Sequence, residues 1–227
     1  MSAEAQKEQA AMSAVAHVES KMVLGLGTGS TAKYATLEIG RRLAAGELRD
    51  LRAAVTSEAT GALARSLGIP VIDLPRGGVD LAIDGMDEVT GTLDAIKGLG
   101  GALLREKIVE ARAARFILIG DASKRVRYLG ERAPVPVEVL PFGLEAASRD
   151  LEALGCRPVL RLSGGRPVTT DNGHHLLDCH FSHPFDPQEV ALAISQIPGV
   201  LGHGLFLGLA HLAYLASDDG VDVLERA

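Results

Sequence analysis

The chain has 227 residues and a mass of 23.8 kDa, which fits one large domain or one domain that carries a smaller one. Aromatic residues make up only 4% and the net charge is −6, which argues against a nucleic-acid-binding surface. The two cysteines, Cys156 and Cys179, are too few for a disulfide framework. No run approaches the roughly 18 apolar residues of a membrane span, and residues 1–21 do not resemble a signal peptide. We therefore expect a soluble, cytoplasmic protein.

Short apolar runs alternate with helical patterns over residues 1–131. The predicted strands cover residues 22–26, 52–55, 71–72, 79–83 and 116–119. The predicted helices cover residues 3–19, 30–43, 58–67 and 101–114. Strands that alternate with helices in this way are typical of an α/β fold with a doubly wound, mostly parallel, Rossmann-like sheet.

The pattern changes near Pro134. Strand patterns at 135–140, 157–162, 174–181 and 200–207 are combined with helical patterns at 143–154 and 187–197. Their order is β-α-β-β-α-β, which predicts a small ferredoxin-like α+β domain. Residues 211–216 are one more strand, which we expect to return to the first sheet. The predicted domains are therefore 1–131 with 208–227, and 132–207 inserted near the C-terminus.

A glycine-rich segment, Gly25–Thr31, lies between a predicted strand and a predicted helix. Glycines permit a sharp turn, and the N–H groups that open the helix then converge, with the hydroxyls of Thr28, Ser30 and Thr31 beside them. This arrangement favours a phosphate site. The spacing G-x-G-x-G, and a next strand that ends in Thr56-Ser57 without an acid, disfavour a dinucleotide. The alternative is a tight turn with capping hydroxyls.

Two acids, Asp84 and Asp87, flank a glycine at the end of the strand 79–83. The carboxyl ends of parallel strands are where such folds place their sites, so both acids are candidates for one pocket. The alternative is turn chemistry that caps the strand. A metal site is a further option, but the segment lacks the glycine and glutamate frame of a calcium loop.

Further candidates follow along the chain. Lys97 precedes the glycine stretch 98–101, and Glu106 lies in the helix that follows. Because leucines 103 and 104 and Ile108 indicate the buried side of that helix, periodicity predicts that Glu106 lies roughly opposite, on a solvated face. Lys124 follows another strand at the same sheet edge, where it either reaches a phosphate or belongs to an ordinary turn.

Four histidines gather between residues 174 and 183, around Cys179. No three side chains among His174, His175, His180, His183 and Cys179 have a tight ligand spacing with a matching distant pair. The histidines are more typical of polar positions on a half-exposed strand. Both cysteines are more typical of small side chains packed in the interior. The sequence thus predicts no metal site here.

Taken in this order, these segments resemble the A-type ribose-5-phosphate isomerase family. The matching segments are GLGTGSTA (25–32), TSEAT (56–60), DGMDEV (84–89), KGLGGALLREKIV (97–109), GDASK (120–124), PVEVLPFG (136–143), TDNGHHLLD (170–178) and PGVLGHGLF (198–206). They cover most of the chain, and the two-domain architecture of the family agrees with the predicted elements. Leu99 and Met86 stand where the family has glycine and alanine, and GHGLF (202–206) replaces ENGLF.

The resemblance implies an aldose–ketose isomerase that interconverts D-ribose 5-phosphate and D-ribulose 5-phosphate through an enediolate, in the non-oxidative pentose phosphate pathway. Glu106 would be the base. Asp84, together with Asp87, would move protons between the sugar oxygens and open the ring, and Lys97 would stabilise the oxyanion. The implied substrate-binding residues are Lys7, Thr28, Gly29, Ser30, Thr31, Asp84, Gly85, Met86, Asp87, Lys97, Gly98, Leu99, Gly100 and Lys124. The scheme needs no metal or organic cofactor, and the family implies a homodimer or tetramer.

Two other classes of protein stay open at this point. A coenzyme A transferase or an amino-sugar phosphate deaminase shares the fold, but the chain is short for either, and the paired DGMDEV and KGLGG segments argue against both. A non-catalytic sugar-phosphate sensor usually carries a DNA-binding module, for which the residues before the first strand leave no room.

Overall fold

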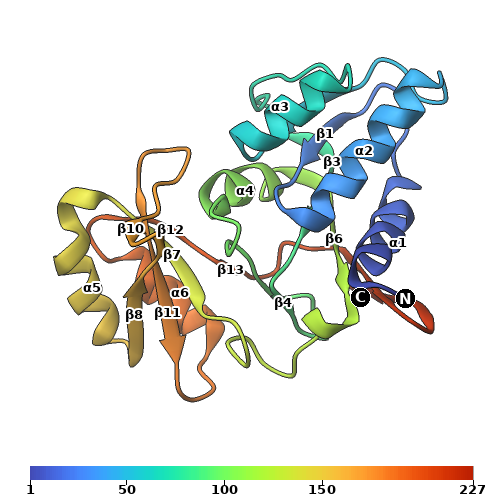
Figure 1. Ribbon diagram of the computed structural model, residues 1–227. Coiled ribbons are helices and arrows are strands. Elements are labelled where there is room, and N and C mark those ends of the chain that lie inside the picture. Colours follow the sequence, from blue (N-terminus) through green and yellow to red (C-terminus); the bar gives the residue numbers. More distant parts are fainter. Residues whose placement is uncertain (227) are drawn as a thin grey trace.

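The computed structural model describes residues 1–226, and its larger part is built around a six-stranded sheet (Figure 1). The strands lie in the order β15 (Gly220–Glu225), β14 (Leu212–Ser217), β6 (Ala113–Asp121), β3 (Val79–Gly85), β1 (Val23–Leu26) and β2 (Arg52–Val55). All neighbours pair in parallel except β14 and β15, which are antiparallel. The predicted mostly parallel sheet is confirmed, and the strand near residues 211–216 does return to it.

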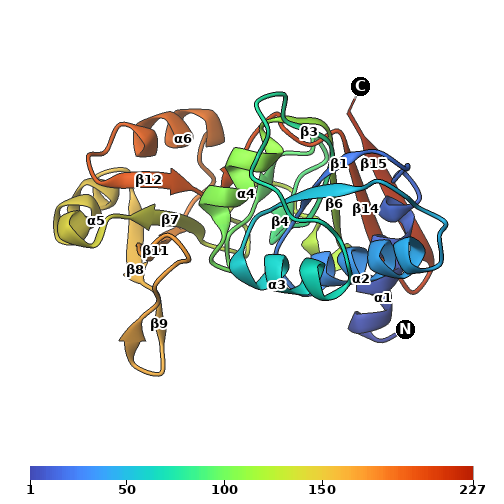
Figure 2. The same ribbon diagram turned by 90° about the horizontal axis from the view of Figure 1, so that it is seen from above.

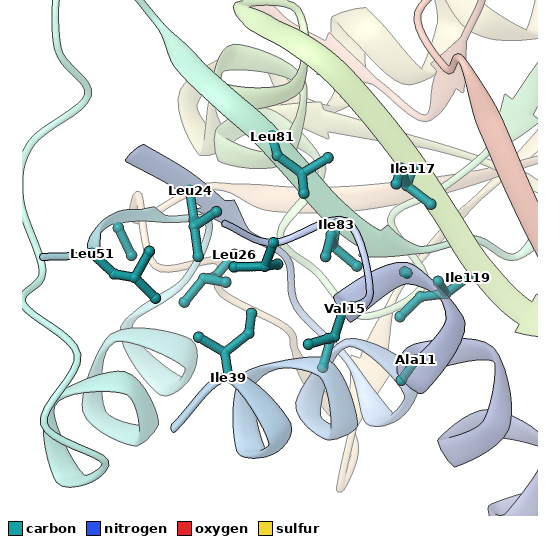
Figure 3. Packing of buried hydrophobic residues seen from close by; sticks show 14 of the residues in the cluster. Ala11, Val15, Leu24, Leu26, Ile39, Leu51, Leu81, Ile83, Ile117 and Ile119 are labelled. Carbon is teal, nitrogen blue, oxygen red and sulfur yellow. The ribbon is translucent and has the colours of Figure 1, made fainter. Parts of the chain in front are cut away.

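Helices cover both faces of this sheet. They are α1 (Ala3–Val15), α2 (Ser30–Ala44), α3 (Glu58–Ser66) and α4 (Leu103–Glu110). On one face, Leu81, Ile83 and Ile119 pack against α1, α2 and α3 (Figure 3). On the other face, Ala82 and Phe116 belong to a second core that includes Val109 of α4. Because both faces are buried, the strands are nearly continuous apolar runs, which is why the sequence identified them.

The rest of the chain forms a four-stranded antiparallel sheet, which lies beside the larger part with α4 between them (Figure 2). Its strand order is β12 (Val200–His203), β7 (Val135–Val139), β11 (His175–Phe181) and β8 (Cys156–Leu160). Helices α5 (Leu144–Glu152) and α6 (Pro187–Ser195) complete the predicted β-α-β-β-α-β order. This part of the chain has its own hydrophobic core. The domain limits 131/132 and 207/208 stay a prediction.

Two small sheets were not expected from the sequence. One joins β13 (Leu205–Phe206), β5 (Ala95–Ile96) and β4 (Glu88–Val89), and the other is the hairpin of β9 (Leu162–Ser163) and β10 (Arg166–Pro167). The prediction of one strand over 200–207 is therefore wrong, since the chain changes sheets at Gly204. A Cβ atom at Gly204 would lie 2.2 Å from the carbonyl oxygen of Lys97, so only glycine permits this close passage.

Several element ends differ from the predictions. The helix predicted over 101–114 is limited to α4, because Gly101 has a positive φ of 84° before it and residues 113–114 already belong to β6. The helix predicted over 3–19 ends at Val15. Val71 makes only a single bridge to Ala53, and β15 was not predicted. Two short 3-10 helices, η1 (Ala122–Lys124) and η2 (Pro141–Gly143), complete the elements. Within residues 1–226, no helix has the length and apolar character needed to cross a membrane.

Candidate active site

A cavity of about 260 Å³ opens near the carboxyl ends of β1, β3 and β6. Its walls are formed by Lys7, Thr28, Gly29, Ser30, Thr31, Gly85, Met86, Asp87, Lys97, Gly98, Gly100, Glu106 and Lys124. Every one of these residues is among those that the family resemblance implies. The structure therefore brings together segments that are distant in sequence. Of the residues implied, Asp84 and Leu99 are the two that do not line the cavity.

The glycine turn after β1 leads directly into α2. Gly29 has a φ of 116° and occupies the N-cap position, and within the described chain no side chain caps this helix. The first N–H groups of an α-helix have no partner inside the helix, so those of α2 are available at the cavity wall. Lys124 on η1 and Lys7 on α1 add ammonium groups to the walls. This end of the cavity has the chemistry of a phosphate site.

The hydroxyl of Thr28 belongs to a cluster that the sequence did not reveal. Its Oγ1 atom lies 2.6 Å from Thr56 Oγ1, 2.8 Å from Ser57 Oγ and 3.3 Å from Thr60 Oγ1. Thr60 also donates to the carbonyl oxygen of Gly27 at 2.9 Å. The hydroxyls of the TSEAT segment (56–60) thus hold the glycine turn in place through Thr28 and Gly27.

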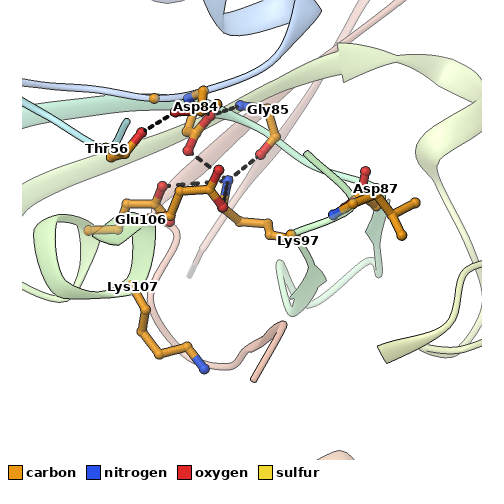
Figure 4. Close-up of polar contacts among 12 residues, drawn as sticks. Thr56, Asp84, Gly85, Asp87, Lys97, Glu106 and Lys107 are labelled. Carbon is orange, nitrogen blue, oxygen red and sulfur yellow. Dashed lines mark hydrogen bonds and ion pairs between the residues drawn. The ribbon is translucent and has the colours of Figure 1, made fainter. Parts of the chain in front are cut away.

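Four charged side chains meet beneath the cavity in a buried cluster (Figure 4). The Nζ atom of Lys97 lies 2.8 Å from Asp84 Oδ2 and 3.5 Å from both Glu106 Oε2 and Glu110 Oε1. It also donates to the carbonyl oxygen of Gly85 at 2.6 Å. The side chain of Lys97 is only 2% exposed. Burial lowers the pKa of Lys97, but the three carboxylates together raise it above its ordinary value, so this lysine stays charged.

Asp84 is buried behind the cavity wall, where its carboxylate contacts both the glycine turn and Lys97. Its Oδ1 atom accepts from the N–H groups of Thr28 at 3.0 Å and Gly85 at 2.6 Å, while Oδ2 faces Lys97. A Cβ atom at residue 27 would lie 2.0 Å from the carboxyl group of Asp84, which explains the glycine there. Asp84 therefore joins the glycine turn to the buried ammonium group.

The prediction that Glu106 lies on a solvated face of its helix is wrong. Glu106 is 3% exposed and Glu110 2%, whereas Ile108 is 43% exposed. The face of α4 that carries the acids is the buried one, because Lys97 supplies a positive charge at that point. Burial, opposed by Lys97, raises the pKa of Glu106 to about 8. A carboxylate with a pKa near neutral pH suits a general base.

Glu110 is a member of this cluster that sequence reasoning missed. It follows Glu106 by four residues, a spacing that puts both side chains on one helix face and is the signal that identifies it. Burial raises the pKa of Glu110 well above its ordinary value. With one ammonium group among Asp84, Glu106 and Glu110, full ionisation would leave two uncompensated negative charges. The cluster therefore holds protons at neutral pH.

Asp87 lies to one side of the buried cluster, at the cavity wall (Figure 4). Its Oδ2 atom accepts from the N–H group of Leu99 at 2.9 Å. Burial raises the pKa of Asp87, and this hydrogen bond lowers it. The Leu99 side chain is 43% exposed, and the positive φ angles of this turn fall on Gly98 and Gly101. The leucine is thus accommodated without entering the cavity.

The histidine segment has other partners. His174 Nδ1 lies 2.9 Å from Glu138 Oε1, and His175 Nδ1 lies 3.2 Å from the carbonyl oxygen of Val168. Over residues 1–226, no three His, Cys, Asp or Glu side chains are grouped as ligands of a metal ion. Cys156 and Cys179 are both buried free thiols.

Comparison with known proteins gives a consistent result. A family model described as ribose 5-phosphate isomerase A (phosphoriboisomerase A) matches residues 52–220. The ribose-5-phosphate isomerase A of Roseiflexus castenholzii is 52% identical over 96% of this chain and 94% of its own. That of Deinococcus radiodurans is 47% identical over the full length of both chains.

Solved structures agree over the whole fold. A D-ribose-5-phosphate isomerase in complex with phospho-erythronic acid superposes with a TM-score of 0.96 and 38% identity, over all of both chains. The ribose 5-phosphate isomerase of Plasmodium falciparum superposes with a TM-score of 0.95 and 38% identity, over 98% of each chain. Fold and relatives together define a sugar-phosphate isomerase. The chain belongs to the ribose 5-phosphate isomerase A family, as the sequence resemblance indicated.

Proposed function

We propose that this protein interconverts D-ribose 5-phosphate and D-ribulose 5-phosphate through an enediolate, as an aldose–ketose isomerase of the pentose phosphate pathway, with Glu106 as its base. The observation that carries the proposal is one cavity whose walls contain both a carboxylate of raised pKa and the free N–H groups that open α2. A family member binds phospho-erythronic acid, a phosphorylated sugar acid, which supports such a substrate.

Glu106 takes the proton from one sugar carbon and returns it to the other. The carboxylate lines the cavity, and its pKa of about 8 lets it both accept and release a proton near neutral pH. Lys97 supplies positive charge where the enediolate develops negative charge, at a buried position where electrostatic interactions are strong.

Asp87 is the group that moves protons between the two sugar oxygens and assists ring opening. It reaches the cavity, whereas Asp84 is buried behind it and has both carboxylate oxygens occupied by Thr28, Gly85 and Lys97. Asp84 therefore acts on the reaction by holding Lys97 and the glycine turn in place. This division of roles is our proposal for the two acids, to which the family resemblance assigned a joint role.

The phosphate group of the substrate binds at residues 28–31, Lys7 and Lys124. The N–H groups that open α2 and two ammonium groups favour a dianion there. Binding energy from this remote end orients the reacting carbons beside Glu106 and contributes to the rate.

The substitution Glu106→Gln tests the assignment of the base. We expect turnover of ribose 5-phosphate to fall on the order of a hundred- to ten-thousandfold, because an amide cannot accept the carbon-bound proton. A binding titration and a melting curve on the same preparation should show that substrate binding and folding persist. Glu145→Gln, in the exposed first turn of α5, is the matched control and should leave turnover unchanged. Full turnover in Glu106→Gln would remove this residue from the mechanism.

A second arm tests the expected independence of metal ions. Activity should be the same before and after treatment with a chelator, since the scheme uses only side chains and N–H groups of this chain. Loss of activity that a divalent ion restores would contradict the scheme. A homodimer or tetramer, and a cytoplasmic location, remain part of the proposal on the strength of the family resemblance and the composition.

A further inference from the structure

Arg161 connects the antiparallel part of the molecule to the wall of the active-site cavity. Its backbone, between β8 and β9, donates to the carbonyl oxygen of Leu176 on β11 at 2.9 Å. Its Nη1 atom donates to the carbonyl oxygens of Gly98 and Leu99, each at 3.0 Å. The Nε and Nη2 atoms bind the two carboxylate oxygens of Asp178, also on β11. This bidentate pair fixes the plane of the guanidinium group.

The peptide group between Gly98 and Leu99 is therefore held from both sides. Its carbonyl oxygen accepts from Arg161 and from the N–H group of Gly101, each at 3.0 Å, and its N–H group donates to Asp87 Oδ2 at 2.9 Å. In a trans peptide these two groups point in opposite directions within one plane. The guanidinium group also polarises the carbonyl, which strengthens the donation of the N–H group to the carboxylate.

The turn itself contributes one contact to this orientation, the donation of the Gly101 N–H group to the carbonyl oxygen of Gly98 at 3.0 Å. Gly98, on one side of the peptide group, has a φ of 106°, and glycine changes its backbone angles at little cost. A tilt of the peptide group would turn the N–H group of Leu99 away from the carboxylate of Asp87. It would also displace Gly98 at the cavity wall. Arg161 adds a partner from outside the turn, and this partner opposes such a tilt.

We infer that Arg161 is a positioning residue of the isomerase reaction, which sets the orientation of the Gly98–Leu99 peptide group and, through it, the geometry and protonation of Asp87. Arg161 is not among the residues that line the cavity, so it acts without touching the substrate. The inference rests on the proposed function, in which Asp87 moves a proton between sugar oxygens.

The groups around Asp87 give the direction of the expected change. Burial raises the pKa of Asp87, the N–H group of Leu99 lowers it, Lys97 and Lys124 lower it, and Asp84 raises it. Removal of Arg161 weakens the contribution of Leu99 and leaves the other groups in place. The pKa of Asp87 then rises, and the part of the pH–rate profile that depends on its ionisation moves to higher pH.

The first experiment is kinetic and uses the double substitution Arg161→Ala with Asp178→Asn, which leaves no unpaired carboxylate. We expect kcat to fall about ten- to a hundredfold, because the catalytic carboxylate is misplaced. KM should change far less, because the phosphate end is intact, and the pH profile should shift as above. Arg157→Ala, at an exposed position of β8, is the control and should match the parent. Arg161→Lys keeps the positive charge but loses the bidentate geometry of the guanidinium group, so its pH–rate profile should also move to higher pH.

The second experiment does not depend on activity. Hydrogen exchange of the Leu99 amide should become at least about tenfold faster in the double variant, since its hydrogen bond to Asp87 is no longer held. A parent protein without isomerase activity would refute the proposed function, while the exchange experiment would still decide the role of Arg161. Unchanged Leu99 exchange, or a loss of activity that only follows the unfolded fraction with an unmoved pH profile, would overturn the inference.

Discussion

Gly27 shows how closely the backbone approaches the buried carboxyl group of Asp84. A Cβ atom added there would lie 2.0 Å from Asp84 Cγ, a distance that no side chain tolerates. We expect Gly27→Ala to displace Asp84, to disturb Lys97 with it, and to lower both turnover and melting temperature. Gly77→Ala is the control, because a Cβ atom at residue 77 would meet nothing within 4 Å. Equal turnover in the two variants would contradict this packing.

The raised pKa of Glu106 has a direct kinetic consequence. As the proposed base, Glu106 must be ionised in the free enzyme, so kcat/KM should rise about tenfold for each pH unit below the pKa and level off above about 8. A rate profile of ribose 5-phosphate isomerisation measures this, and the residual rate of Glu106→Gln should lack the dependence. A limb near the ordinary pKa of a glutamate, about 4.5, would contradict the rise in pKa that burial gives Glu106.

At this scale the sequence predicted which residues meet but not how deeply they lie. Glycine turns and acids at strand ends are local signals, and they led to part of the cavity wall, whereas Lys7, Met86 and Glu106 were assigned to the site only through the family resemblance. The burial of Glu106 was not predictable from helical periodicity. A charged face is buried only when an opposite charge meets it, and Lys97 comes from a different element. Glu110 was missed for the same reason.

Among the elements, long apolar strands and their helices were predictable, while the short connecting strands were not. The strands β4, β5 and β13 have two residues each, too few for any periodicity. Their pairing depends on a contact between residues near 96 and residues near 205. Local sequence carries no information about such a contact. For this reason the prediction of a single strand over 200–207 was wrong.

Lys107 attaches helix α4 to the segment where β12 ends and β13 begins. Its side chain points away from the buried cluster (Figure 4). Its Nζ atom donates to the carbonyl oxygens of His203 at 2.6 Å and Leu205 at 2.9 Å, and lies 4.8 Å from the centre of the Phe206 ring. Burial lowers the pKa of Lys107 to about 7. The lysine therefore joins α4 to the segment between the two larger sheets.

Replacement of this lysine should weaken the connection. Lys107→Met keeps the length of the side chain but leaves two buried carbonyl groups unpaired, and each costs about 1–3 kcal/mol of the free energy of unfolding. Urea denaturation measures the loss. Lys33→Met, at an exposed position of α2, should stay within about 0.5 kcal/mol of the parent. A Lys107→Met protein as stable as that control would show that the carbonyl groups find other partners.

At the scale of the whole molecule, the antiparallel part exposes several large apolar side chains. Phe142 is 98% exposed and Leu192 is 66% exposed. Large apolar side chains exposed in this way often belong to protein–protein interfaces. We expect self-association to cover such side chains, in line with the proposed homodimer or tetramer. Sedimentation equilibrium should give a mass two or four times 23.8 kDa. A mass of 23.8 kDa at micromolar concentration would contradict the proposal.

The return of the chain to β14 also determines the order in which the protein is completed during synthesis. One edge of β6 pairs with β3, but its other edge pairs with β14, which is made only after residues 122–211. All four strands of the antiparallel sheet precede β14 in the chain, so they are made before the strand that covers that edge. Throughout this interval the nascent chain carries an unpaired, apolar strand edge, which is open to pairing with other chains. Strand β14 thus protects the newly made enzyme from such pairing once it covers this edge of β6.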